Sequence, residues 1–215
     1  MLKSLFGHTV SDSLDLLVRR LKEGGCLVYP TETLFGLGCD ALNADAVAAI
    51  YQAKERSATK PLPLIAADVS MAARFCRLDH VPRALLDLWP GPLTLLLPAA
   101  APFAAPLVDA RGRVALRVSA HPGARALVRG LGRPMTATSA NRSGRAAADD
   151  IAALDPLIVE RIGLVADLPP HPAGGLPSTI VSVPEDGGGC TVRLHREGAV
   201  SASTLESLGL AVLCR

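Results

Sequence analysis

Two lysines and an arginine lie close together in residues 54–61, which read KERSATKP. The chain has only four lysines among its 215 residues, and most of its positive charge is arginine. Because a lysine ammonium is a compact point charge, Lys54 and Lys60 on either side of Arg56 indicate a site that grips phosphate oxygens. The exposed end of a helix would give the same cluster, since cations are favoured there.

Three segments rich in hydroxyl groups each lie next to an apolar stretch with the character of a strand. They are residues 31–33, residues 138–144 and residues 175–181. Open α/β sheets bind ligands beyond the ends of their strands, and hydroxyl and amide donors stabilise oxyanions without adding net charge. Ordinary turns and helix caps would also use these residue types.

Other polar residues fall at expected strand ends, namely Arg117, Ser119, His121 and Arg196. A histidine directly before a proline, as in His121-Pro122, is typical of a helix cap. No Ser-His-Asp or Cys-His pattern stands out, and no paired carboxylates recur near the polar loops. The sequence therefore indicates a site that positions reactants and stabilises anions, without covalent catalysis.

Residues 36–41 formally fit the dinucleotide-binding pattern G-x-G-x-x-A. That pattern binds pyrophosphate where it directly follows a strand, and the preceding strand is expected to end earlier, at Pro30. The P-loop pattern G-x-x-x-x-G-K-[ST] does not occur. Five scattered cysteines without a C-x-x-C pair argue against a zinc site or a disulfide framework.

The spacing of apolar residues and the turn signals predict an alternation of helices and strands. Helices are expected from Ser11 to Gly24 and at 43–53, 69–76, 81–88, 121–131 and 203–208. Strands are expected at 26–29, 61–66, 93–97, 114–118, 134–138, 163–166, 178–183 and 191–195. Residues 31–42 and 98–108 are expected to be a loop and a linker, and Gly187–Gly189 a flexible hairpin connection. This order favours a mixed sheet with helices on its faces.

Composition favours one α/β domain over residues 1–215, with its core at about 10–200. Apolar residues make up 49% of the chain, which suits a large buried core. Aromatic residues make up 3% and the net charge is +2, which argues against a base-stacking or broadly basic RNA-binding surface. The sequence has no secretory h-region, and prolines break its longest apolar stretch, so we expect a cytoplasmic protein.

Taken in order, these segments resemble the Sua5/YrdC/TsaC family of threonylcarbamoyl-AMP synthases, in its short single-domain form. The matching pieces are residues 29–38, 54–62, 89–94, 114–118, 138–144 and 178–181. The resemblance implies an α/β fold with a twisted mixed parallel and antiparallel sheet and helices on its faces. It also implies a deep, positively charged cavity within that fold.

The resemblance implies a nucleotidyltransferase that condenses L-threonine, bicarbonate and ATP into threonylcarbamoyl-AMP and pyrophosphate, for t6A37 modification of tRNA. The catalytic signature of the family corresponds to Lys54, Arg56, Ser139 and Asn141. Contacts with ATP are implied at these four residues and at Lys60 and Arg196. Contacts with threonine are implied at Thr33, Arg117, Thr138 and Ser178. Mg²⁺ is expected with ATP, and no residue is assigned as a metal ligand.

Two alternatives stay open. One is a module that binds tRNA or double-stranded RNA without catalysis, and the other is a paralogue of the fold with different carbamoyl chemistry. The expected partners include tRNA and the downstream threonylcarbamoyl transferase complex, and no membrane. Glu55 and Ser57 stand where many family members carry Gly and Pro, and Glu55 is expected to point away from Arg56 on an extended segment.

Overall fold

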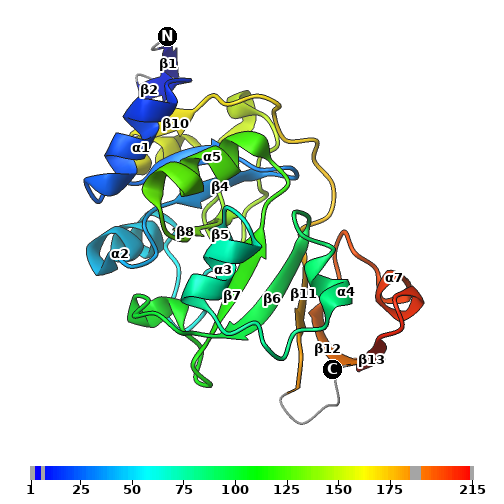
Figure 1. Cartoon of the computed structure of the whole chain (residues 1–215). Helices are drawn as coiled ribbons and strands as arrows, with labels where there is room; N and C mark the ends of the chain where they lie inside the picture. Colours follow the sequence, from blue (N-terminus) through cyan, green and yellow to red (C-terminus); the bar gives the residue numbers. More distant parts are fainter. Residues whose placement is uncertain (1–2, 6–7, 185–189, 214–215) are drawn as a thin grey trace.

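The computed structural model describes residues 3–5, 8–184 and 190–213, and their strands form two sheets (Figure 1). Across the first sheet the strands are β1 (Lys3–Leu5), β2 (His8–Ser11), β10 (Leu164–Ala166), β3 (Leu27–Pro30), β4 (Phe35–Gly38) and β9 (Thr138–Ser139). Across the second they are β13 (Ala211–Leu213), β12 (Thr191–Arg196), β11 (Thr179–Ser182), β6 (Leu93–Pro98), β7 (Arg113–Val118), β5 (Leu64–Ala66) and β8 (Met135–Thr136).

Both sheets contain parallel and antiparallel neighbours, which confirms the mixed α/β prediction. The sequence indicated a single sheet, whereas the predicted strand at 134–138 divides between the two. Its first part, β8, pairs with β5 in the second sheet, and β9 pairs with β4 in the first. Ala137, between them, donates its N–H to the carbonyl of Pro63 at 2.7 Å. This crossing joins the sheets and brings Thr138 and Ser139 to their junction.

The helices are α1 (Leu14–Lys22), α2 (Ala44–Ala53), α3 (Val69–Phe75), α4 (Arg83–Leu86), α5 (Pro122–Leu131), α6 (Pro156–Ile162) and α7 (Ala202–Ser207), with 3₁₀ turns η1 (Ala105–Leu107) and η2 (Ile151–Ala153). The sequence predicted all of these α-helices except α6. Helix α1 begins after Ser13, because Ser11 ends β2. Leu17 and Leu21 of this helix are buried, whereas Leu14 is 38% exposed.

Strand β4 lies within the segment that was predicted to be a loop, so that prediction is wrong. It forms an antiparallel hairpin with β3, in which Tyr29 is opposite Gly36. The ring of Tyr29 covers both glycines, and a Cβ at Gly38 would lie 2.9 Å from a ring carbon. The glycines of this G-x-G pattern therefore make room for an aromatic ring inside a strand.

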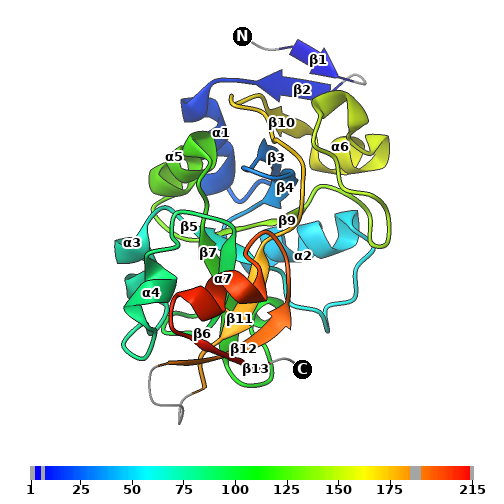
Figure 2. The same cartoon turned by 90° about the vertical axis from the view of Figure 1, so that its right-hand side faces the viewer.

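The helices cover the sheets on several sides (Figure 2). Helix α1 packs against α5, α2 packs against α6, and α3 packs on β5 and β7. In the second sheet, Leu95 and Leu97 are almost fully buried on one face, while Leu96 on the opposite face is partly exposed. Arg117 shares the face of Leu96, because Leu96 pairs with Ala115 and side chains alternate along a strand.

The predicted hairpin connection at Gly187–Gly189 lies outside the described residues, while β11 and β12 on either side of it pair antiparallel. Within the described part of the chain, no helix has the length and apolar character that a bilayer span requires.

Candidate active site

The predicted site residues line two adjoining cavities whose walls come from both sheets and from the loop after α2. The Arg117 cavity has a volume of about 360 Å³, and all four residues predicted to contact threonine line it, Thr33, Arg117, Thr138 and Ser178. The Lys54 cavity has a volume of about 370 Å³ and is lined by Lys54 and Lys60. Arg56, Ser139 and Asn141 line both cavities, and Arg196 lines the first. Segments far apart in the sequence therefore meet at one place.

Lys54 ends α2 and is buried, with an exposed fraction of only 2%. Its Nζ donates hydrogen bonds to the backbone carbonyls of Ser139 and Asn141, both at 2.5 Å. Burial lowers the pKa of Lys54 to about 8, and the positive charge of Arg56 acts in the same direction. Lys54 thus lies at the end of a helix, as the alternative explanation of the basic cluster expected. Its ammonium, however, is buried and is not a solvated cation.

The loop that follows β9 is held in shape by its own side chains. Ser139 Oγ donates to Asn141 Oδ1 at 2.5 Å, and Asn141 Nδ2 donates to the carbonyls of Arg142 and Arg145 at 2.9 and 2.6 Å. The N–H of Ser143 donates to the carbonyl of Lys54 at 3.0 Å. The hydroxyl of Ser139 and the amide of Asn141 thus bond within the loop, and their contact with phosphate stays a prediction.

The loop after α2 positions Arg56 between the two cavities. Its Nε donates to the carbonyl of Lys60 at 3.2 Å, and Nη2 donates to the carbonyl of Pro61 at 3.5 Å. The expectation of an extended conformation at Glu55 is wrong, because its φ is +52°, in the left-handed region. The carboxylate of Glu55 pairs with Arg161 at 2.9 Å.

Arg117 projects from β7 into the first cavity with a buried guanidinium. Its Nη1 donates to Oε1 of Glu32, and Ser119 Oγ donates to Oε2 of the same carboxylate at 2.5 Å. Burial lowers the pKa of Arg117 to about 10, and nearby Arg196 acts in the same direction. The adjacent carboxylate of Glu32 favours the charged form, so Arg117 is a cation at neutral pH.

Arg196 and Ser178 tie the end of β12 to the start of β11. Nε and Nη2 of Arg196 donate to the carbonyl of Ser178 at 3.1 and 2.7 Å, and burial lowers the pKa of Arg196. The hydroxyls of Ser178 and Thr94 lie 2.9 Å apart. Across the cavity, Thr33 belongs to the hairpin turn that Thr31 stabilises by donating to the carbonyl of Leu34 at 2.7 Å. The wall is therefore preorganised.

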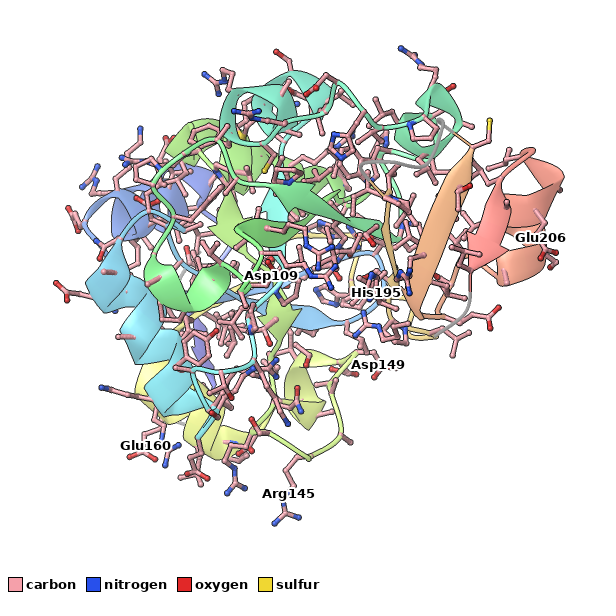
Figure 3. The ribbon with its side chains drawn as sticks, turned by 90° about the horizontal axis from the view of Figure 1, so that it is seen from below. Asp109, Arg145, Asp149, Glu160, His195 and Glu206 are labelled. Atoms are coloured by element: carbon pink, nitrogen blue, oxygen red, sulfur yellow. The ribbon has the colours of Figure 1, made fainter. Side chains whose placement is uncertain are left out.

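The sequence assigned no substrate contact to Glu32, Thr94 or Arg145, which all lie at the site. Glu32 contacts the Arg117 guanidinium and is not among the residues that line the cavity; the sequence indicated its Thr-Glu-Thr segment but assigned no contact to Glu32 itself. Thr94 contacts Ser178 through the register of β6 and β11, which the sequence does not reveal. Arg145 lines the Arg117 cavity and extends outward at the edge of the molecule in Figure 3. His121 caps α5 as predicted, with Nδ1 accepting from the N–H of Ala124 at 3.1 Å.

Two larger cavities, of about 570 and 610 Å³, lie on the open face of the second sheet and contain none of the predicted site residues. Both are lined by Leu96, Arg111, Arg113 and Arg193. Asp109 and His195, which line the larger one, lie near the centre of Figure 3. Arg113 pairs with Asp109 at 2.8 Å, so this arginine has a carboxylate partner of its own.

The Sua5_yciO_yrdC family model, described as "Telomere recombination", matches residues 19–198. A threonylcarbamoyl-AMP synthase of Alkalilimnicola ehrlichii is 40% identical over 153 residues, which are 71% of this chain and 80% of that protein. A threonylcarbamoyl-AMP synthase of Stenotrophomonas maltophilia is 38% identical over 160 residues, covering 72% of this chain and 86% of that protein.

Among solved structures, P. abyssi Sua5 complexed with L-threonine superimposes with a TM-score of 0.79 and 28% identity. The match covers 93% of this chain but only 58% of the Sua5 chain, so this chain spans little more than half of that protein. Family model, sequence relatives and structural neighbour agree with the family that the sequence motifs indicated. The chain therefore belongs to the Sua5/YciO/YrdC family.

Proposed function

We propose that this protein is an L-threonylcarbamoyl-AMP synthase, a nucleotidyltransferase that condenses L-threonine, bicarbonate and ATP and releases pyrophosphate. The observation that carries the proposal is the meeting of Arg56, Ser139 and Asn141 where the two cavities adjoin. One cavity adds buried Lys54, and the other adds Arg117. The names of the sequence relatives and the threonine complex of the structural neighbour support the same reaction.

The proposed chemistry needs charge stabilisation and positioning. The carboxylate of N-carboxythreonine attacks the α-phosphate of ATP, a P–O bond forms, and the bond to pyrophosphate breaks. Negative charge grows on the phosphoryl oxygens, so cations and preorganised donors lower the barrier. Lys54, Arg56 and Lys60 would provide the cations, with Ser139 and Asn141 fixing the loop beside them and Arg196 across the cavity.

Threonine would lie in the Arg117 cavity. A guanidinium suits a carboxylate because it offers parallel N–H donors, and Arg117 is the buried guanidinium there. The hydroxyls of Thr33, Thr138 and Ser178 line the same cavity and would bond the amine and hydroxyl of the amino acid. Placing the two substrates in adjoining cavities would bring the reacting carboxylate beside the α-phosphate.

Mg²⁺ is part of the proposal as the companion of ATP. Glu55 carries a carboxylate and lines the Lys54 cavity. No cluster of three or more His, Cys, Asp or Glu side chains suited to a metal is found in the described ranges. A single carboxylate residue fits an Mg²⁺ ion that is held mainly by phosphate oxygens and water, as is common when Mg²⁺ binds with nucleotides. The ion would neutralise phosphate charge.

The t6A37 modification of tRNA, the downstream threonylcarbamoyl transferase complex, contact with tRNA and a cytoplasmic location remain parts of this proposal. They are supported by the resemblance of the sequence to threonylcarbamoyl-AMP synthases.

The proposal is tested by incubating the purified protein with MgATP, bicarbonate, pyrophosphatase and labelled L-threonine. Chromatography and mass spectrometry should detect threonylcarbamoyl-AMP. Two phosphate ions should be released for each adenylate formed, because pyrophosphatase hydrolyses the pyrophosphate. Omission of bicarbonate, or replacement of threonine by valine, is the control, and each should remove the product. Absence of any threonine-dependent adenylate over a range of bicarbonate concentrations would refute the proposed reaction.

A further inference from the structure

We propose that Glu32 is a positioning residue, which orients the Arg117 guanidinium so that it can bind the carboxylate of the amino-acid substrate. The inference rests on the proposed function and adds a residue to it. Arg117 lines the cavity, whereas Glu32, which contacts the guanidinium, is not among the residues that line it. The side chains are 7% and 17% exposed, so this is a nearly buried ion pair and not a surface contact.

The carboxylate of Glu32 is itself held in place. Ser119 Oγ donates to Oε2 at 2.5 Å, while Oε1 accepts from Arg117. Ser119 Oγ also accepts from the N–H of His121 at 3.2 Å, which connects the network to the cap of α5. The carbonyl of Glu32 accepts from the N–H of Ala173 at 3.3 Å. Backbone and side chain of Glu32 are both anchored, so it can fix the plane of the guanidinium.

The positive charges at the cavity make a carboxylate beside Arg117 electrostatically favourable. Arg117 and Arg196 line the same cavity, and two guanidiniums near one another repel. A buried cation without a partner is strongly unfavourable, and Arg117 would turn away from Arg196 or draw in another anion. Glu32 compensates the charge through one N–H of Arg117. The fork of a guanidinium has further donors, and these remain for a ligand in the cavity.

Two other roles of Glu32 would change the binding of the substrates in other ways. If Glu32 occupied the donors that the substrate needs, its carboxylate would compete with the substrate, and removing it would strengthen threonine binding. If the pair served only the fold, its loss would change the binding of both substrates to the same extent. The KM for threonine, compared with the KM for ATP, therefore separates positioning from competition and from general damage.

The experiment compares Glu32→Gln with wild type by measuring pyrophosphate release while threonine and MgATP are varied separately. Gln keeps the shape of the side chain and removes its charge. We expect the KM for threonine to rise about 10- to 100-fold, with the KM for ATP within about twofold of wild type. The expected effect disappears in an Arg117→Lys background, where adding Glu32→Gln changes the threonine KM less than about twofold.

Asp109→Asn is the matched control, because Asp109 pairs with Arg113 on the same strand, four residues before Arg117. Both KM values should stay at the wild-type level in this variant. If Glu32→Gln shows no cooperative thermal transition, Ser119→Ala decides instead. That variant keeps both charges and loses one hydrogen bond to the carboxylate, so we expect the threonine KM to rise about threefold.

An unchanged or lowered threonine KM in Glu32→Gln, or an equal rise of both KM values, would overturn the inference. An unchanged threonine KM in Ser119→Ala would do so where the first variant is unfolded. If the wild type makes no adenylate, the proposed function fails, and calorimetric titration with threonine takes over. Weaker threonine binding by Glu32→Gln than by wild type then supports positioning, and a wild type that does not bind threonine overturns it.

Discussion

Two buried cations on the walls of the candidate site are held in different ways. The ammonium of Lys54 contacts two neutral backbone carbonyls, those of Ser139 and Asn141. The guanidinium of Arg117 contacts the charged carboxylate of Glu32. Lys54 therefore keeps a net charge in a desolvated place, and its pKa falls to about 8. The Arg117–Glu32 pair has no net charge, and it offers directed N–H donors.

The difference corresponds to what the two proposed substrates need. Phosphate oxygens gather negative charge during the reaction, so an uncompensated cation close to them stabilises the transition state. A threonine carboxylate keeps its charge throughout, so it requires geometry that selects and aligns it. Substitutions at Lys54 should consequently lower the rate of the chemical step, whereas substitutions at the Arg117 pair should weaken threonine binding.

The largest expected effect is that of Lys54→Met. Met fills the buried space but removes the charge and leaves the carbonyls of Ser139 and Asn141 without their donor. We expect kcat to fall about 100- to 1,000-fold, or about 3–4 kcal/mol at 1.36 kcal/mol per tenfold. Steady-state rates at saturating threonine and ATP give the measurement.

Lys60→Met is the matched control, because Lys60 lines the same cavity from an exposed position. It should lose less than about tenfold in kcat, since an exposed charge is screened by water. Equal losses in both variants would mean that the buried contact of Lys54 with the loop has no special importance.

A smaller effect concerns pH. Since the pKa of Lys54 is lowered to about 8, its ammonium is charged below that pH and neutral above it. Arg117 has a pKa of about 10, so it stays charged through the inflection near pH 8, and its own titration is common to wild type and Lys54→Arg. The ratio of wild-type kcat to that of Lys54→Arg should therefore be constant up to about pH 8 and fall about tenfold per pH unit beyond it.

The ratio cancels the titration of the substrates, which is the same for both proteins. A ratio that stays constant to pH 9.5 would indicate that Lys54 acts through its N–H donors alone, because the neutral amine still has two. The proposed contrast between the charge of Lys54 and the directed N–H donors of Arg117 would then be wrong. Glu32→Gln should keep the wild-type inflection near pH 8, since its effect is on Arg117.

The local signals in the sequence were sufficient for much of the fold. The helix expected to start at residue 43 is confirmed, with Asn43 capping α2 by accepting from Ala46, and His121 caps α5 as expected by accepting from Ala124. Caps are read within a few residues, so no distant contact is needed to predict them. Strand β4 was missed because Gly36 and Gly38 are typical of loops. Glycine is needed at these positions because the ring of Tyr29 covers them. That contact arises only when β3 and β4 pair.

The same division applies to the candidate site. Spacing and residue type identified the loops, and the structure brings them together at two adjoining cavities. What could not be predicted is how each side chain is held. The Arg117–Glu32 pair joins residues 85 positions apart, and the Lys54–Ser139 contact also joins residues 85 apart. Such contacts follow from sheet register and from the crossing at Ala137, which a single sequence does not specify.

The smallest expected effect is at Glu55, beside Lys54, where φ is +52°. A non-glycine residue in this region costs about 1–2 kcal/mol, whereas glycine adopts it freely. Glu55→Gly also loses the exposed pair with Arg161, worth about 0–1 kcal/mol, and gains freedom in the unfolded chain. We expect the free energy of unfolding to rise by about 0.5 kcal/mol and kcat to stay within twofold, as measured by urea unfolding and steady-state rates.

Glu55→Ala isolates the backbone contribution to that change, because it loses the same ion pair with Arg161 but keeps a Cβ in the left-handed conformation. The glycine variant should be more stable than the alanine variant by about 0.5–1 kcal/mol. If alanine proves equal or better, the left-handed turn is not a strained position, and the glycine common in the family has another cause. A large loss of kcat in Glu55→Gly would instead show that the turn positions Lys54, which would extend the charged wall of the site to this residue.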